Sequence, residues 1–194
     1  VAYAWYTEND NRARLRLVAT AGASKAPPRT LIDNPEISEI LPFDWSRDGR
    51  WIAVKVKRVD RVAQIGLVNP ESGSLSVLQT VDWNGVGGLR FSPDSRWLAF
   101  HRPERDGSFE RDVVAIALDS SRLVPAAATK ADESVVEWTL DGTRLLVASD
   151  RGGSVGIWAV PFHQGVPDSR LELVRPDVGY LRSVALSASG ALFY

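Results

Sequence analysis

The sequence predicts an all-β protein built from repeated antiparallel sheets, and two observations carry this prediction. A ten-residue pattern recurs along the 194-residue chain, and no segment has the periodicity of an amphipathic helix. Its three clear copies read WSRDGRWIAV from Trp45, FSPDSRWLAF from Phe91 and WTLDGTRLLV from Trp138. A degraded copy, LSASGALFY, begins at Leu186. Successive copies start 46, 47 and 48 residues apart, so the chain spans about four repeat periods.

Each part of the pattern has a physical role in a β-hairpin. The aromatic residue that begins each copy ends one strand, and we expect the three aromatics to be buried equivalently, wedged between neighbouring sheets. Asp followed by Gly or Ser supplies the side-chain hydrogen bond and the positive φ that a two- or three-residue hairpin loop requires. The apolar run that follows suits a strand buried on both faces. Because Asp48, Asp94 and Asp141 share this position, we interpret them as turn residues and not as metal ligands.

The pattern resembles the WD40-like (PD40) repeat of TolB-like β-propellers, whose hallmark is an aromatic-Ser-Pro-Asp-Gly turn followed by Trp-Leu-Ala-Phe. Residues 91–100 match it almost throughout, with Ser95 in place of the glycine, whereas the other two copies carry Arg47 and Leu140 in place of the proline. The resemblance implies a β-propeller of four-stranded antiparallel blades and favours a periplasmic or extracytoplasmic location. It implies little about activity, because the same blade serves periplasmic adaptors, sensor domains and the gating domains of serine peptidases.

On this basis we expect one propeller portion, with blades over 1–39, 40–86, 87–133 and 134–181 and a partial blade over 182–194. Strands are expected near 1–6, 13–19, 29–32, 41–46, 50–57, 62–68, 75–79, 88–92, 96–102, 112–118, 123–124, 135–139, 143–149, 155–161 and 170–174. The first of these fits the second strand of a blade whose first strand is missing. Since propellers usually have roughly 4–8 blades, we interpret the chain as part of a larger ring. The alternative is that residues 192–194 pair with the N-terminal strand and close or dimerise the unit.

Composition narrows the classes of partner and cofactor. A net charge of −1 with 24% charged residues predicts no attraction for nucleic acid or an anionic membrane. No apolar run approaches the roughly 20 residues of a membrane-spanning helix. The absence of cysteine excludes disulfides, thiolate zinc sites and a cysteine nucleophile. We expect no cofactor, because phosphate-cradling and dinucleotide motifs are missing and His101 and His163 lack metal-site spacing. The chain also lacks methionine and begins at Val1, which indicates a piece of a longer polypeptide.

A Gly-x-Ser-x-Gly sequence surrounds Ser154, as in the nucleophile elbow of α/β-hydrolases. That elbow needs a strand, a sharp turn and then a helix. Here both flanking segments, 145–148 and 155–160, read as strands. The only candidate base nearby, His163, would lie at the far end of the following strand. We therefore interpret the glycines as part of a hairpin and expect no catalytic residue in the chain.

Candidate binding residues come from the geometry that a propeller imposes. Loops that join blades, and loops between second and third strands, share the face at the mouth of the central channel, and surface loops on a rigid scaffold commonly carry binding sites. We call this the channel-mouth face. Trp83, Asn84 and Tyr180 belong to its blade connections. Trp83 is either an exposed anchor for a ligand or a packing wedge between blades.

A second set of candidates immediately precedes the three anchoring aromatics. These residues are Asp44, Arg90 and Glu137, with Ala185 in the degraded copy. Because one repeat position on successive first strands lies beside the channel, we predict an acid–base–acid belt there. The alternative is three solvated side chains in a wet channel.

The sequence therefore predicts a non-catalytic binding or scaffolding propeller that contacts a protein or peptide through its channel-mouth loops. Self-association through the incomplete terminal blades is a further interaction to test. The alternative function is the gating propeller of a prolyl-oligopeptidase-type serine peptidase whose hydrolase domain lies outside this chain.

Overall fold

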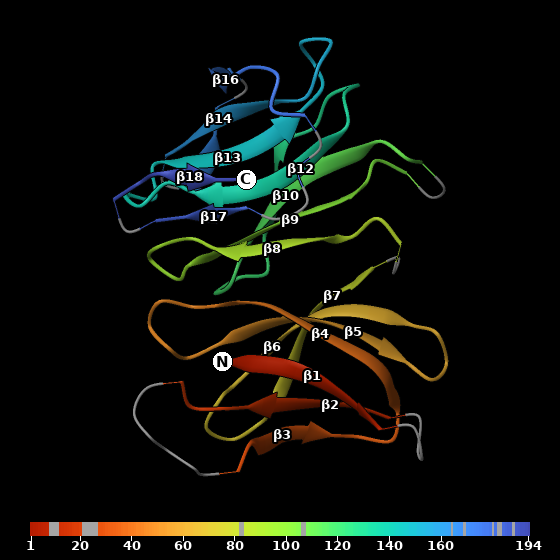
Figure 1. The fold of residues 1–194 in the computed structure, drawn as a ribbon. Coiled ribbons are helices and arrows are strands. Elements are labelled where there is room, and N and C mark those ends of the chain that lie inside the picture. The colour runs from red at the N-terminus through yellow and green to blue at the C-terminus, as the bar shows by residue number, and fades with distance from the viewer. Residues whose placement is uncertain are drawn as a thin grey trace. The chain divides into compact units, whose positions relative to one another are not determined.

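The computed structural model describes residues 1–7, 12–20, 27–81, 84–105, 108–163, 165–168, 170–179, 181, 184–187 and 189–194 (Figure 1). In this part of the chain the regular secondary structure consists of β-strands joined by turns, which confirms the predicted all-β class. The chain divides into two compact units, Val1–Trp83 and Asn84–Tyr194. Within the described ranges, no helix is long and apolar enough to cross a membrane.

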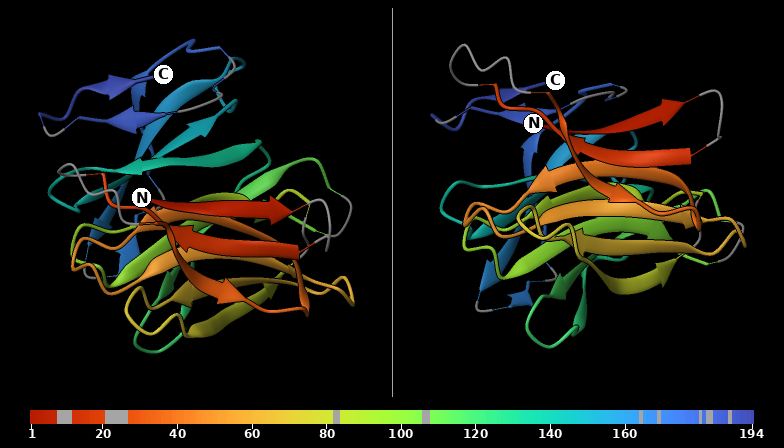
Figure 2. Two further views of the ribbon diagram at one scale, coloured as in Figure 1. Left: turned by 60° about the horizontal axis from the view of Figure 1, so that its bottom comes forward. Right: turned by 90° about the horizontal axis from the view of Figure 1, so that it is seen from below.

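The first unit contains two antiparallel sheets, with strand orders β1-β2-β3 and β4-β5-β6-β7 (Figure 2). Their bounds are β1 (Ala2–Thr7), β2 (Arg12–Leu17), β3 (Arg29–Asp33), β4 (Ile37–Trp45), β5 (Ile52–Arg58), β6 (Ala63–Val68) and β7 (Leu75–Val81). Buried aliphatic side chains, including Leu15, Ile40 and Val54, form one core shared by the two sheets. Among the described residues β1 pairs with β2 alone. This agrees with its expected place as the second strand of a blade.

The second unit contains a sheet of order β8-β9-β10-β11, a sheet of order β12-β13-β14 to which β15 and β16 add by pairing with β14, and the hairpin β17-β18. Their bounds are β8 (Gly87–Phe91), β9 (Trp97–Pro103), β10 (Arg111–Ala117), β11 (Leu123–Ala127), β12 (Glu133–Trp138), β13 (Arg144–Ser149), β14 (Gly156–His163), β15 (Val166–Pro167), β16 (Glu172–Arg175), β17 (Ala185–Leu186) and β18 (Leu192–Phe193). Val113, Val147 and Phe162 belong to the core between the two larger sheets. The β8–β11 sheet therefore has the four strands of the predicted blade, whereas the β12–β16 sheet has five.

The apolar run of each of the three clear pattern copies lies in the second strand of a sheet of four or five strands, and most of its residues are buried, as predicted. Five consecutive residues from Ile52 are buried in β5, and five from Leu145 are buried in β13. β5 pairs with β4 and β6, and β13 pairs with β12 and β14, so each of these strands lies in the interior of its sheet.

The turn chemistry of the pattern is confirmed in all three clear copies. In the first, Asp48 accepts hydrogen bonds from the Ser46 hydroxyl at 2.6 Å and from the Arg50 amide at 3.1 Å, and Gly49 has a φ of +74°. The same contacts recur in the triplets Ser92–Asp94–Arg96 and Thr139–Asp141–Thr143, with positive φ at Ser95 and Gly142. The recurrent aspartates are therefore turn formers, as interpreted.

The hairpin loop is longer than predicted. The Ser46 amide donates to the Trp51 carbonyl, and the Trp51 amide donates to the Ser46 hydroxyl, each at 2.9 Å. Residues 47–50 therefore form a four-residue loop, and the prediction of two or three residues was wrong. The reason is that the Ser46 hydroxyl, and not the Ser46 carbonyl, accepts the hydrogen bond from the Trp51 amide.

The prediction of equivalent burial is confirmed for Phe91 and Trp138, which are 5% and 2% exposed, and wrong for Trp45, which is 37% exposed. The Trp138 indole donates to the Arg90 carbonyl on β8, the first strand of the adjacent sheet, at 3.1 Å. The Trp45 indole donates instead to the Gly49 carbonyl in its own turn. Trp45 faces the β1-β2-β3 sheet, in which the described residues form no strand equivalent to β8, and this accounts for its exposure.

Candidate functional site

Charged side chains gather where β9 ends and β10 and β12 begin, which is the channel-mouth end of the second unit. The Arg111 guanidinium holds Asp132 with two parallel hydrogen bonds, of 2.8 Å from Nε and 2.6 Å from Nη2. The Arg111 amide also donates to the same carboxylate, at 3.1 Å. The hydrogen bonds from Arg111 lower the pKa of the Asp132 carboxyl, and burial opposes them. The forked geometry fixes the connection between the two larger sheets, because it restrains both side chains in one plane.

Glu133, the first residue of β12, follows Asp132 in the chain and is fully buried. Its Oε1 accepts hydrogen bonds from the Thr129 hydroxyl at 2.8 Å and from Arg151 Nη2 at 2.9 Å. Burial is the main cause of the raised pKa of Glu133, and its contacts with Thr129 and Arg151 oppose the rise. Glu133 Oε2, Arg151 Nε and Trp158 Nε1 have no hydrogen-bond partner within the described part of the protein.

The same arginine position carries an ion pair in the first unit. Arg58 and Arg151 each stand 13 residues after their anchoring tryptophan, and each binds a carboxylate from the residues that enter the first strand of its own sheet. Arg58 binds Glu36 at 3.0 Å and Asp60 at 3.3 Å. We call the Arg58 and Arg151 sets, together with Arg111–Asp132, the mouth ion pairs.

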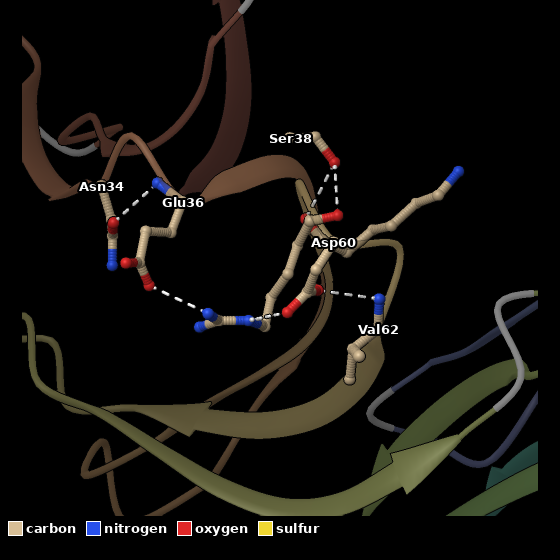
Figure 3. Close-up of polar contacts among 7 residues, drawn as sticks. Asn34, Glu36, Ser38, Asp60 and Val62 are labelled. Carbon is tan, nitrogen blue, oxygen red and sulfur yellow. Dashed lines mark hydrogen bonds and ion pairs between the residues drawn. The ribbon is translucent and has the colours of Figure 1, made fainter.

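The set in the first unit is held by its own loops (Figure 3). Asp60 accepts a hydrogen bond from the Val62 amide at 3.0 Å, and the Asn34 carboxamide oxygen accepts one from the Glu36 amide at 2.9 Å. The Val62 amide is the largest cause of the lowered pKa of Asp60, and Arg58 adds to it. These carboxylates are about half exposed, so the set orders loops at the surface and adds little stability.

One of the two ion pairs of the predicted belt, Arg90–Glu137, lies within the second unit and is formed. Arg90 Nε lies 3.2 Å from Glu137 Oε2, and the two side chains are 23% and 25% exposed. Glu137 also accepts a hydrogen bond from the Trp138 amide at 3.0 Å, and Asp44 accepts the equivalent bond from the Trp45 amide at 2.8 Å. Asp44 belongs to the other unit, so its contact with Arg90 stays a prediction, as does any binding role for the belt.

The blade-connection candidates are only partly described. Trp83 and Tyr180 lie outside the described residues, so the structure places neither. Asn84 is exposed in a turn, followed by Gly85 with a φ of +79°. Its role in binding stays a prediction. Sequence reasoning did not find the mouth ion pairs. Arg58 and Arg151 share a repeat position, which is a sequence signal for their two pairs, whereas Arg111–Asp132 has no such signal.

The Gly-x-Ser-x-Gly sequence lies in a β-hairpin. Ser154 is exposed between β13 and β14, and the segment that follows it is the strand β14 and not a helix. His163 ends β14, so at about 3.3 Å per residue it lies roughly 23 Å along the strand from the hairpin. The other histidine, His101, accepts a hydrogen bond from the Val135 amide through Nδ1. These positions agree with the interpretation of Ser154 as a turn residue. Among the described residues, no group of three His, Cys, Asp or Glu side chains could hold a metal ion.

A cavity of about 500 Å³ opens at the opposite end of the second unit, where the hairpin turns of the two larger sheets meet. Trp97, Trp138 and Phe162 form its aromatic wall, with Phe162 packed edge-on against both tryptophans at centroid distances of 5.2 and 5.0 Å. The Arg122 guanidinium lies 5.3 Å from the Trp97 ring centroid. Sequence reasoning missed this cavity, because its walls come from four separate turns.

Comparisons with known proteins agree with this architecture. No protein-family model matches the chain. A curated protein of Emericella nidulans, named probable dipeptidyl-peptidase 5, is 31% identical over 175 residues, which cover 77% of this chain and 23% of that protein. A protein of the same name from Aspergillus clavatus is 29% identical over 148 residues, which cover 66% and 20%. The chain thus spans about a fifth of the length of these curated relatives.

Solved structures show the same fold. TolB from Acinetobacter baumannii superposes with a TM-score of 0.67 at 20% identity, covering 98% of this chain and 51% of that one. The tricorn protease superposes with a TM-score of 0.71 at 14% identity, covering 94% and 21%. The chain therefore has the all-β architecture of the propeller domains in these proteins, and the resemblance inferred from the repeat is confirmed.

Proposed function

We propose that this chain is the gating propeller of a prolyl-oligopeptidase-type serine peptidase, and that the hydrolase domain lies outside its 194 residues. The observation that carries the proposal is the 31% identity to probable dipeptidyl-peptidase 5 over 77% of the chain. The match covers only 23% of that protein, which leaves ample length for a separate catalytic domain.

The geometry of the chain supports a role in admitting peptides to a catalytic domain rather than in cleaving them. Ser154 occupies an exposed hairpin and lies far from His163, so it lacks the base that a serine nucleophile needs. At the channel-mouth end, Arg111–Asp132 and Arg151–Glu133 hold the connecting loops in fixed positions. We infer that the charged loops held by these pairs select peptides at the mouth of the complete ring and leave bond cleavage to another domain.

A covalent probe of serine hydrolases tests this function. The longer polypeptide that contains these residues should be labelled by a fluorophosphonate at one serine outside residues 1–194. Residues 1–194 alone should not be labelled. Ser154→Ala in the longer polypeptide should leave the labelling unchanged. Labelling at Ser154, or a longer polypeptide with no reactive serine, contradicts the proposal.

A second candidate, the non-catalytic binding or scaffolding propeller, is favoured by the likeness to TolB, which covers 98% of this chain. It predicts that the longer polypeptide has no reactive serine and that a protein or peptide binds the channel-mouth loops. The same labelling experiment therefore separates the two candidates.

A further inference from the structure

The cavity at the turn end of the second unit has the size of a small-molecule site. Its volume, about 500 Å³, lies within the range of roughly 300–1,000 Å³ that ligand pockets occupy. Its walls come from the turns β8–β9, β10–β11 and β12–β13 and from the segment that joins β14 to β15. All of these segments belong to one unit, so the cavity is complete within it.

Three aromatic side chains form the apolar wall of this cavity. Phe162 packs edge-on against Trp97 and Trp138, with interplanar angles of 76° and 88°. Edge-to-face contacts of this kind fix the planes of the rings. The Trp138 indole N–H is already bonded to the Arg90 carbonyl at 3.1 Å, so this ring offers apolar surface and no donor. The wall is therefore a preformed surface for an aromatic or bulky apolar group.

Arg122 supplies a cation beside the wall. Its guanidinium lies 5.3 Å from the Trp97 ring centroid, and its Nη2 makes one long hydrogen bond, of 3.5 Å, to the Gly165 carbonyl. Within the described ranges, no carboxylate lies within ion-pairing distance of it. A guanidinium has five N–H donors in one plane, and stacking on an indole restrains that plane. Most of the Arg122 donors are therefore available to a ligand.

The other charged side chains of the lining do not neutralise Arg122. The lining has two arginines and two aspartates, so recognition depends on where each charge lies. Asp94 accepts hydrogen bonds from the Ser92 hydroxyl and the Arg96 amide of its own turn. Asp119 is exposed in the β10–β11 turn, three positions before Arg122, and does not contact that guanidinium. A ligand group at Arg122 thus meets a cation without a bound acid.

We propose that this cavity binds a carboxylate that carries an aromatic or bulky apolar group. The apolar group packs on Trp97 and Phe162, and the carboxylate accepts forked hydrogen bonds from Arg122. A sulfate or phosphate ion would leave the aromatic wall unused, and an amine would be repelled by the guanidinium. The site does not rest on the proposed function, because it uses no residue of the mouth ion pairs. Free small molecules and peptide C-termini share this chemistry, and the test separates these two sources.

Probes that differ in one group test the chemistry. Phenylpropionate has both the ring and the carboxylate, phenylpropionamide lacks the charge, and acetate lacks the ring. In the NMR spectrum of residues 1–194, phenylpropionate should shift the indole signals of Trp97 and Trp138. The signal of Trp158, which lies beside the β13–β14 turn at the other end of the sheet, should not move. The amide should bind about tenfold more weakly, and acetate at equal concentration should shift neither signal.

A pair of arginine variants then shows whether Arg122 is the partner. Arg122→Gln should lower the affinity for phenylpropionate about tenfold, to that for the amide, and leave the affinity for the amide unchanged. The unchanged amide affinity shows that the cavity itself is intact. Arg175→Gln is the control, because exposed Arg175 pairs with Ile157, roughly 16 Å along β14 from Phe162. A preference for the acid that survives Arg122→Gln, or an equal loss in Arg175→Gln, overturns the proposal.

A peptide with phenylalanine at its free C-terminus, and the same peptide with a C-terminal amide, identify the source of the carboxylate. Binding of the free-acid peptide with the same dependence on Arg122 supports the site and identifies peptide ends as ligands. Binding of phenylpropionate alone supports the site and identifies small carboxylates. If neither acid binds, the proposal is wrong. Fluorophosphonate labelling is independent of all these results, so this site and the peptidase function can fail separately.

Discussion

Asp132 and Glu133 are neighbours in the chain, yet the fold changes the pKa values of their carboxyl groups in opposite directions. Hydrogen bonds from Arg111 lower the pKa of Asp132, whereas burial raises the pKa of Glu133. The cause is the different surroundings of the two residues where the chain enters β12. Asp132 stays at the surface beside a guanidinium, and Glu133 points into the sheet, where its contacts with Thr129 and Arg151 offset only part of the lost hydration.

Asp132 should make the protein sensitive to acid. Its folded pKa lies below the ordinary value of 3.8, so its stabilising contribution is present above about pH 4 and is lost as the pH falls through the folded pKa. We expect Asp132→Asn to lower the free energy of unfolding at pH 7, and the gap from the wild type to close in more acidic solution. Urea denaturation over this range measures the gap. A gap that persists unchanged in acid would show that the asparagine acts by another route.

The anchoring aromatics should differ in their contribution to stability. Phe91 is 5% exposed and Trp45 is 37% exposed. Phe91→Ala should cost about 3–5 kcal/mol, as the loss of a large core side chain does. Trp45→Ala should cost clearly less, because much of its ring already contacts water. Thermal or urea unfolding of the two variants decides this, and an equal loss at both sites would contradict the packing described for Trp45.

At the scale of elements, two turn glycines of the first unit have the same backbone conformation but different space for a side chain. Gly49 and Gly73 have nearly the same φ, +74° and +73°. A β-carbon at Gly49 would meet nothing within 4 Å, whereas one at Gly73 would lie 2.4 Å from the Leu31 carbonyl oxygen on β3. The turn between β6 and β7 therefore packs directly on the main chain of the neighbouring sheet.

Alanine at these two positions should have unequal effects. Gly49→Ala should cost on the order of 1 kcal/mol, the usual penalty for a left-handed backbone without glycine. Gly73→Ala should cost more, because the main chain of β3 must also shift. The difference between the two free energies of unfolding isolates the steric part. If the two costs are the same, the approach of this turn to Leu31 is not tight in solution.

The sequence predicted what depends on short separations along the chain. Asp94 bonds residues two positions away on either side, so the pattern alone indicated its turn. Arg111 and Asp132 are 21 residues apart, and Trp138 and Arg90 are 48 apart. Such contacts depend on how neighbouring sheets pack against each other. The residues of a single repeat do not specify that packing. The exposure of Trp45 depends on the strand content of the adjacent sheet, and no residue of its own pattern copy indicates it.

At the scale of the whole molecule, two copies of the repeat carry the same acid–tryptophan pair, one in each unit. The residue before the anchoring tryptophan is acidic in both Asp44 and Glu137, and each acid caps the amide of its tryptophan. Glu137 also pairs with Arg90 on the preceding sheet. Arg90 has further donors, so a second acid could share it if the two units meet as successive blades.

A double-mutant cycle on Asp44 and Arg90 tests that arrangement, with Arg90 and Glu137 as the internal reference. The reference pair is about three-quarters shielded, so we expect its coupling energy to be close to or somewhat above the roughly 1 kcal/mol of an exposed pair. If the acid–base–acid belt forms, the Asp44–Arg90 coupling should be of similar size, because the guanidinium can offer separate donors to two carboxylates. Urea unfolding of the single and double alanine variants measures both couplings. A clear value for Arg90–Glu137 beside none for Asp44–Arg90 would show that charge joins the two larger sheets of the second unit and does not join the units to each other.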